Sequence, residues 1–271
     1  METDLLLLLL GGAAAGAFGA LLGLGGGVLI VPLLTIGFNI PLASAVGTSL
    51  ISVVATSAGA AALNVRARRA DVRLGIALAP GTILGAAAGG AMAGIFPEYL
   101  LTGAFAALLV YVGVVLLRST ARRSGASDGT APVDPSAPDG PDVPAYRAHR
   151  LPLALGGSLG VGMMSSLLGV GGGIVQVPLM RLVMGAPMAV AAATSNYLLG
   201  ITAAAGAYAY LLRGEVDPAV AGPMVLGATI GAVSGARVAP LVKAGWLTLL
   251  FVVVIGWIAL QMALRALELA T

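Results

Sequence analysis

The second half of the chain repeats the first half. A shift of 146 residues, from Gly27 to Gly173, lays the stretch GLGGGVLIVP at 23–32 onto GVGGGIVQVP at 169–178. The same shift superposes identical residues further along, among them Pro41, Thr48, Asp71, Gly81, Gly85 and Gly89. Chance does not hold one register over such a length, so the chain carries an internal duplication and we expect two equivalent halves.

Composition places both halves in a membrane. The 271 residues are 59% hydrophobic and only 9% charged, and the mean hydropathy is +1.02. Soluble domains carry far more charge, and the long apolar runs lack the alternation of an outer-membrane barrel. We therefore expect an all-α polytopic protein of the cell inner membrane, in contact with the lipid bilayer. The basic residues cluster at the ends of apolar runs, which indicates membrane topology and gives no support for nucleic-acid binding.

Each half divides into the same five segments. A run of about eighteen apolar residues (5–22 and 151–168) precedes one of about twelve (27–38 and 173–184), and three ordinary membrane spans follow. We expect those spans at 42–64, 73–96 and 99–117, and at 187–212, 219–241 and 245–264. The predicted domains are two membrane repeats, 1–118 and 151–271, joined by a flexible linker at 119–150 that is rich in Pro, Gly and Asp. Because the first residues are acidic, we interpret the N-terminal run as a membrane segment rather than a signal peptide.

The first two runs of each half cannot form one straight helix. Together they cover about 34 residues, or on the order of 50 Å of helix, against a hydrocarbon core of about 30 Å. The glycine triplets lie where the break must fall. We expect a broken or re-entrant helical hairpin in each half, followed by three transmembrane helices.

Charge bias at equivalent loops predicts how the halves are oriented. RARRADVR at 66–73 corresponds to RGEVD at 213–217, and Glu98 near one loop corresponds to Lys243 near the other. By the positive-inside rule, equivalent loops of opposite bias lie on opposite sides, so we expect an inverted repeat. A parallel repeat with both termini inside is the alternative. In the inverted topology the N-terminus is external and the linker is cytoplasmic, together with Arg66, Arg68, Arg69, Arg73, Arg118, Arg122, Arg123, Arg147, Arg150, Arg181 and Lys243.

The glycine breaks are the best candidates for a binding site. Irregular backbone at membrane depth must be buried in protein or line a cavity, because lipid offers its polar groups no partners. Glycine allows main chain to approach a ligand, and a helix starting there directs N–H groups at an anion. The candidate residues are Gly25, Gly26, Gly27 and Val28 in the first half and Gly171, Gly172, Gly173 and Ile174 in the second. Tight helix crossing is the competing explanation for these glycines.

Polar side chains near the breaks extend this candidate site. Thr48 and Ser49, with Thr194, Ser195 and Asn196, can donate to the oxygens of a ligand, or they can bond back to helix carbonyls. Gln176 replaces Ile30 of the first copy as a single amide among apolar neighbours. Arg237 near the end of an apolar span either contacts an anion or snorkels to the interface.

Other conspicuous residues have structural explanations, and several chemistries have no residues to use. We expect the glycine ridges at 81, 85, 89 and 227, 231, 235 to serve helix packing, and Asp71 and Asp217 to cap their helices. The chain has no cysteine and one histidine, so we expect no metal or other cofactor. Since no span carries a central acid or a histidine base, we expect no enzyme and no proton relay of buried carboxylates.

The duplicated GLGGGVLIVPLL and GVGGGIVQVPLM, each followed about sixteen residues later by Thr-Ser, resemble the sulfite exporter TauE/SafE family of bacterial permeases. The resemblance covers nearly the whole chain outside the linker. It implies export of small sulfur-containing anions, such as sulfite or organosulfonates, with the matched glycines and Thr-Ser pairs as site residues. We therefore expect a secondary transporter that works by alternating access around a midplane site, with a homo-oligomer as a possible assembly. A passive anion channel is the alternative function, and a structural membrane subunit is a third.

Overall fold

The structure is a computed structural model that describes residues 2–22, 26–66, 70–123, 151–186, 188–238 and 244–270. Those residues form helices joined by short turns, without a strand, as predicted. The first half contains α1 (Glu2–Leu22), α2 (Gly27–Pro32), the π-helical turn η1 (Leu33–Gly37), α3 (Leu42–Arg66), α4 (Val72–Met92) and α5 (Glu98–Arg123). The second half contains α6 (Leu151–Leu168), α7 (Gly173–Met184), α8 (Met188–Leu212), α9 (Pro218–Val238) and α10 (Ala244–Ala270).

Helix lengths and surface composition fit a multi-pass membrane protein. Within the described residues, five helical stretches are long and apolar enough to cross a membrane: Leu42–Ala62, Val72–Met92, Glu98–Val115, Pro218–Gly235 and Val252–Leu269. The helix α8 occupies the remaining expected span, and each of the six begins within one residue of its predicted start. Large apolar side chains such as Leu84, Leu226 and Trp257 lie exposed on the outside, where lipid would cover them.

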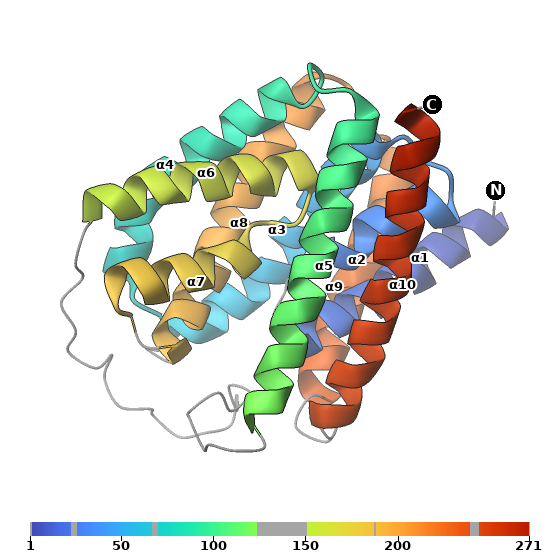
Figure 1. The fold of residues 1–271 in the computed structure, drawn as a ribbon. Helices are drawn as coiled ribbons and strands as arrows, with labels where there is room; N and C mark the ends of the chain where they lie inside the picture. Colours follow the sequence, from blue (N-terminus) through green and yellow to red (C-terminus); the bar gives the residue numbers. More distant parts are fainter. Residues whose placement is uncertain are drawn as a thin grey trace.

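The two halves exchange their packing partners. The first helix of each half packs along the fourth helix of the other half, α1 against α9 and α6 against α4 (Figure 1). Glycines form both seams: a Cβ at Gly227 would lie 2.1 Å from the carbonyl oxygen of Leu9, and one at Gly231 would lie 1.9 Å from that of Ala13. Residue numbers rise in the same direction along both helices of each pair, since Gly81 of α4 lies against Leu155 of α6 and Gly89 lies against Met163, so the helices of each pair run parallel. The predicted packing role of the glycine ridges is confirmed.

Two further pairs join helices at equivalent positions in the two halves. In α3 and α8, Gly47 lies against Tyr210 while Gly200 lies against Ser57, so these helices run antiparallel. The pair α5 and α10 stands side by side at one edge of the molecule (Figure 1). It is antiparallel as well, since Gly103 approaches Ala266 and Gly113 approaches Ile255.

Local sequence signals explain several helix ends. The carboxylate of Asp71 accepts the N–H of Leu74 at 3.0 Å, and that of Asp217 accepts the N–H of Ala219 at 2.9 Å, so both residues cap helix starts as predicted. The helix α5 continues to Arg123, inside the segment expected to be linker. The rest of that segment, 124–150, lies outside the described residues, as does Lys243.

Candidate functional site

Both glycine motifs break the helical backbone inside the protein. Gly26 precedes α2 with φ of 78°, and Gly172 precedes α7 with φ of 83°; both are left-handed conformations that favour glycine. Gly169 and Gly171 also have positive φ, and Gly26, Gly27 and residues 169–173 are all buried. The short helices begin at Gly27 and Gly173, as expected. Gly25 lies outside the described residues, and for Ile174 the structure describes the backbone alone.

A serine from the first half joins the two breaks. The hydroxyl of Ser49, on α3, donates to the carbonyl oxygen of Gly169 at 2.7 Å and lies 3.3 Å from that of Gly27. The breaks are in close contact, since a Cβ at Gly27 would lie 2.7 Å from the Gly169 oxygen. In the second half Ser195 repeats part of the pattern, with its hydroxyl 3.4 Å from the carbonyl oxygen of Gly173.

The second break also reaches the centre of the helix crossing. A Cβ at Gly171 would meet Val53 of α3 at 2.8 Å and Leu199 of α8 at 2.9 Å. Val53 and Leu199 are equivalent residues of the two halves, separated by the same shift of 146 positions. Gly171 therefore lies where the two repeats meet.

The predicted Thr-Ser pairs are buried in α3 and α8, but their threonines differ in their contacts. Thr194 accepts a hydrogen bond from the backbone N–H of Asp71 at 2.9 Å, which ties the start of α4 to α8. At the equivalent positions Thr48 and Asp217, both of which the structure describes, no such bond forms. Val28 is buried at the start of α2, and Asn196 is half-buried.

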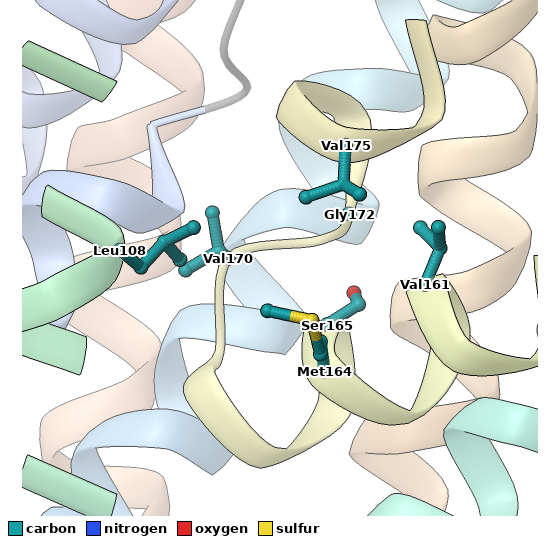
Figure 2. A pocket seen from close by; sticks show the side chains of 7 residues that line it. All are labelled: Leu108, Val161, Met164, Ser165, Val170, Gly172 and Val175. Carbon is teal, nitrogen blue, oxygen red and sulfur yellow. The ribbon is translucent and has the colours of Figure 1, made fainter. Parts of the chain in front are cut away.

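A small cavity of about 10 Å³ lies beside the second break. Figure 2 shows its lining, which comes from α5, α6, the break itself and α7: Leu108, Val161, Met164, Ser165, Val170, Gly172 and Val175. Ser165 is 2% exposed, and its hydroxyl has no hydrogen-bond partner. Gln176, one helical turn beyond Gly172, is equally buried, and both ends of its amide are unpartnered.

A larger cavity of about 150 Å³ opens between the halves at the start of α3 and the end of α8. Arg213 stands in its wall, donates to the carbonyl oxygen of Gly90 at 2.9 Å and forms an ion pair with Glu215. Its guanidinium lies 5.7 Å from the ring centre of Tyr210, within the range of a cation–π contact. Glu98 lines the same cavity, so an acidic and a basic residue both contribute to its wall.

Neither Ser165 nor Arg213 was a predicted site residue. Ser165 lies near the end of an apolar run and is equivalent to Gly19 of the first half. The available signal was a polar residue that occurs in only one repeat. Arg213 belongs to a loop whose charge bias indicated only the orientation of the halves. Arg237 lies exposed in the last turn of α9.

Comparisons with known proteins agree with this architecture. The profile of the sulfite exporter TauE/SafE family matches residues 8–262. The chain belongs to this family. It is 26% identical over 236 residues to the "Probable membrane transporter protein YunE" of Bacillus subtilis, covering 84% of this chain and 85% of the relative. A "Probable membrane transporter protein" of Haemophilus influenzae is 28% identical over 228 residues, 80% of this chain and 78% of its own length. No solved structure matches.

The groups around the second break of this TauE/SafE protein are suited to binding an anion. The second break presents hydroxyl, amide and helix N-terminal N–H groups, which are hydrogen-bond donors to anionic oxygens. Among the described residues, no group of three or more His, Cys, Asp or Glu residues could hold a metal ion. The curated relatives are named as transporters, in line with the sequence prediction.

Proposed function

We propose that this member of the TauE/SafE family is a secondary transporter that exports small sulfur-containing anions, such as sulfite or organosulfonates, across the bacterial inner membrane. Alternating access occurs around a midplane site at the glycine breaks. The substrate class comes from the family, because the residues of the site by themselves specify only a small anion.

The contact between the two breaks carries the proposal. Paired helix breaks at corresponding places in two repeats are the best indicator of a transporter's binding site. Here Ser49 links the carbonyl oxygen of Gly169 to the break at Gly27. A structural subunit would have no need for two buried non-helical segments that meet at the centre. The helix α7 adds a start without a side-chain cap, where N–H groups stay free for an anion.

Helix directions support an inverted repeat, with each glycine hairpin re-entering the side from which it came. Equivalent helices of a parallel repeat cross the membrane in the same direction, whereas α3 and α8 run antiparallel, and so do α5 and α10. The ends of α3 and α4 that carry Arg66 and Arg73 then lie in the cytoplasm, and the larger cavity near Arg213 opens to the outside.

Alternating access would use equivalent contacts at the two ends of α3 and α8. At one end, the bond from Asp71 to Thr194 holds the repeats together. At the other end Thr48 and Asp217 are not bonded within the described chain, and the cavity of about 150 Å³ lies between the halves. In an inverted repeat the two ends exchange conformations, so the opposite state would bond Asp217 to Thr48 and release Asp71 from Thr194.

Flux measurements in proteoliposomes test this function. We expect saturable uptake of sulfite that an excess of unlabelled sulfur oxyanion on the opposite side accelerates. Gly172→Ala should reduce uptake at least about tenfold, because a side chain there costs ~1–2 kcal/mol of backbone strain and would crowd Ser165. Gly185→Ala is the matched control: Gly185 has φ of 71° but no atom within 4 Å of a Cβ. A conductive flux that does not saturate would instead identify the passive channel.

A further inference from the structure

The hairpin of α6 and α7 holds a concentration of unpartnered polar atoms. Among the described residues, buried side-chain atoms without a hydrogen-bond partner occur on Ser165, Ser166, Gln176 and Glu215. The first three belong to this hairpin. Buried polar groups in proteins nearly always have a partner, so each of these atoms calls for an explanation.

The first repeat shows that the fold does not need these groups. The residues equivalent to Ser165, Ser166 and Gln176 are Gly19, Ala20 and Ile30, and none of them has a polar side chain. Ile30 is completely buried in the first hairpin. The same supersecondary unit therefore forms with apolar residues, and the polar residues of the second hairpin destabilise it unless something binds there.

One of the three residues lines the small cavity, and a second lies one helical turn away from it. Ser165 lines that cavity, and its oxygen lies 3.3 Å from a Cβ built on Gly172 (Figure 2). Gln176 follows Gly172 by four positions, and its N–H is bonded to the Gly172 oxygen at 3.0 Å, so its backbone lies one helical turn beyond this residue of the cavity wall. Ser166 faces another way, toward Gly90 and Gly206. The first turn of α7, a helix of 12 residues, adds its N–H groups.

The hydrogen-bonding capacity of these groups indicates what they bind. The N–H groups of α7, the Ser165 hydroxyl and the Gln176 Nε2 donate to anionic oxygens, whereas the Gln176 Oε1 can only accept. An oxyanion without a proton offers only acceptors and leaves that oxygen unpaired. We propose that the second repeat alone holds the transported anion, and that the bound species is a small oxyanion that keeps one O–H or N–H donor for Gln176.

This inference rests on the proposed function and assigns the substrate to one repeat. The first hairpin then has a structural role: its helix α2 has six residues, and the Ser49 hydroxyl is already bonded to main-chain carbonyls. The cavity of about 10 Å³ admits a guest of about the size of one water molecule. Binding of a larger anion therefore requires α7 to separate from α6.

Thermal stabilisation of the purified protein by two matched anions tests the inference. Sulfamate and methanesulfonate have the same shape and charge, but only sulfamate carries N–H donors. For the wild type we expect sulfamate to bind at least about tenfold more tightly, as one additional hydrogen bond to a buried partner predicts. In Gln176→Ile, which copies the first repeat, this preference should disappear, and the ligand-free melting temperature should rise. Ser165→Gly, which copies Gly19, should weaken the binding of both anions.

Ser166→Ala is the control, because it removes an unpartnered hydroxyl on the other side of α6. It should raise the melting temperature and leave both affinities unchanged. Equal binding of the two anions by the wild type, or an unchanged preference in Gln176→Ile, would overturn the inference while the proposed function stands; water would then serve these polar atoms. A wild type stabilised by neither anion nor by sulfite would overturn the proposed substrate class and the inference together.

Discussion

Gly231 illustrates how single residues determine the approach of helices in this protein. Its position in α9 lies so close to α1 that an added Cβ would stand 1.9 Å from the carbonyl oxygen of Ala13. Backbone, unlike the end of a flexible side chain, cannot move aside without moving the helix. Small residues let transmembrane helices pack closely where no hydrophobic effect drives association between them. The seam therefore depends on the absence of side chains.

Alanine substitution of two glycines in α9 checks this dependence. Gly231→Ala should destabilise the protein by ~1–3 kcal/mol, the usual penalty for overpacking. Gly222→Ala, in the same helix but with no atom within 4 Å of the added Cβ, should be neutral or stabilising by up to ~1 kcal/mol through helix propensity. Thermal unfolding of the purified variants in detergent measures both effects. Equal melting temperatures for the two variants would contradict the packing role.

At the scale of elements, α3 and α8 form an antiparallel pair whose two ends differ. The repeats are equivalent in sequence at Thr48 and Thr194, yet only Thr194 is bonded to the turn before the fourth helix of a repeat. In the alternating-access cycle that we propose, these different contacts belong to one of two states. The side chains at each end of the pair can therefore set the balance between the states.

Removing the hydroxyl of Thr194 and removing that of Thr48 should shift access in opposite directions. The natural chain has no cysteine, so Ala43→Cys places a single thiol in the wall of the larger cavity. Thr194→Val should slow labelling of that thiol about fivefold, because losing a hydrogen bond worth ~1 kcal/mol favours opening at the other end. Thr48→Val should maintain or increase labelling. Labelling rates with an impermeant maleimide measure the effect, and a matching response of both variants would contradict the mechanism.

Local and long-range features of these elements differ in how far sequence predicts them. The helix starts, the breaks at Gly26 and Gly172 and the caps at Asp71 and Asp217 follow from local rules of apolar length, positive φ and N–H capping. Local rules do not predict which helices pair at the glycine seams, because α1 packs on a helix some two hundred residues away along the chain. Ser49 is a similar case. Its hydroxyl donates to a carbonyl oxygen 120 positions away along the chain, whereas the sequence indicated either a ligand or a carbonyl of its own helix as the partner.

The whole molecule combines two halves through helices at equivalent positions, α3 with α8 and α5 with α10, each pair antiparallel. In the inverted repeat that we propose, both chain ends lie on the same side of the membrane and the linker lies on the opposite side. Basic residues agree, since Arg66 and Arg73 lie at the end of the bundle away from the larger cavity. Orientation in the membrane then follows from the charge of a few loops.

Reporter fusions determine this topology directly. A reporter that is active only outside the cytoplasm should be active when fused at the N-terminus or after residue 271, and inactive when inserted into the linker at 124–150. The same insertion with a cytoplasmic reporter should give the reverse pattern. A pair of cytoplasmic termini would contradict the inverted repeat and support the parallel arrangement.

The exchange of first helices between the halves bears on how the protein is made. When the ribosome has released only α1 to α5, neither α1 nor α4 has met the helix against which its glycine seam closes, because both partners lie in the half still to be synthesised. In this early insertion intermediate, the glycine-lined faces of α1 and α4 therefore lack their partner helices. Lipid or an insertion chaperone must cover these two faces until α6 and α9 have been synthesised.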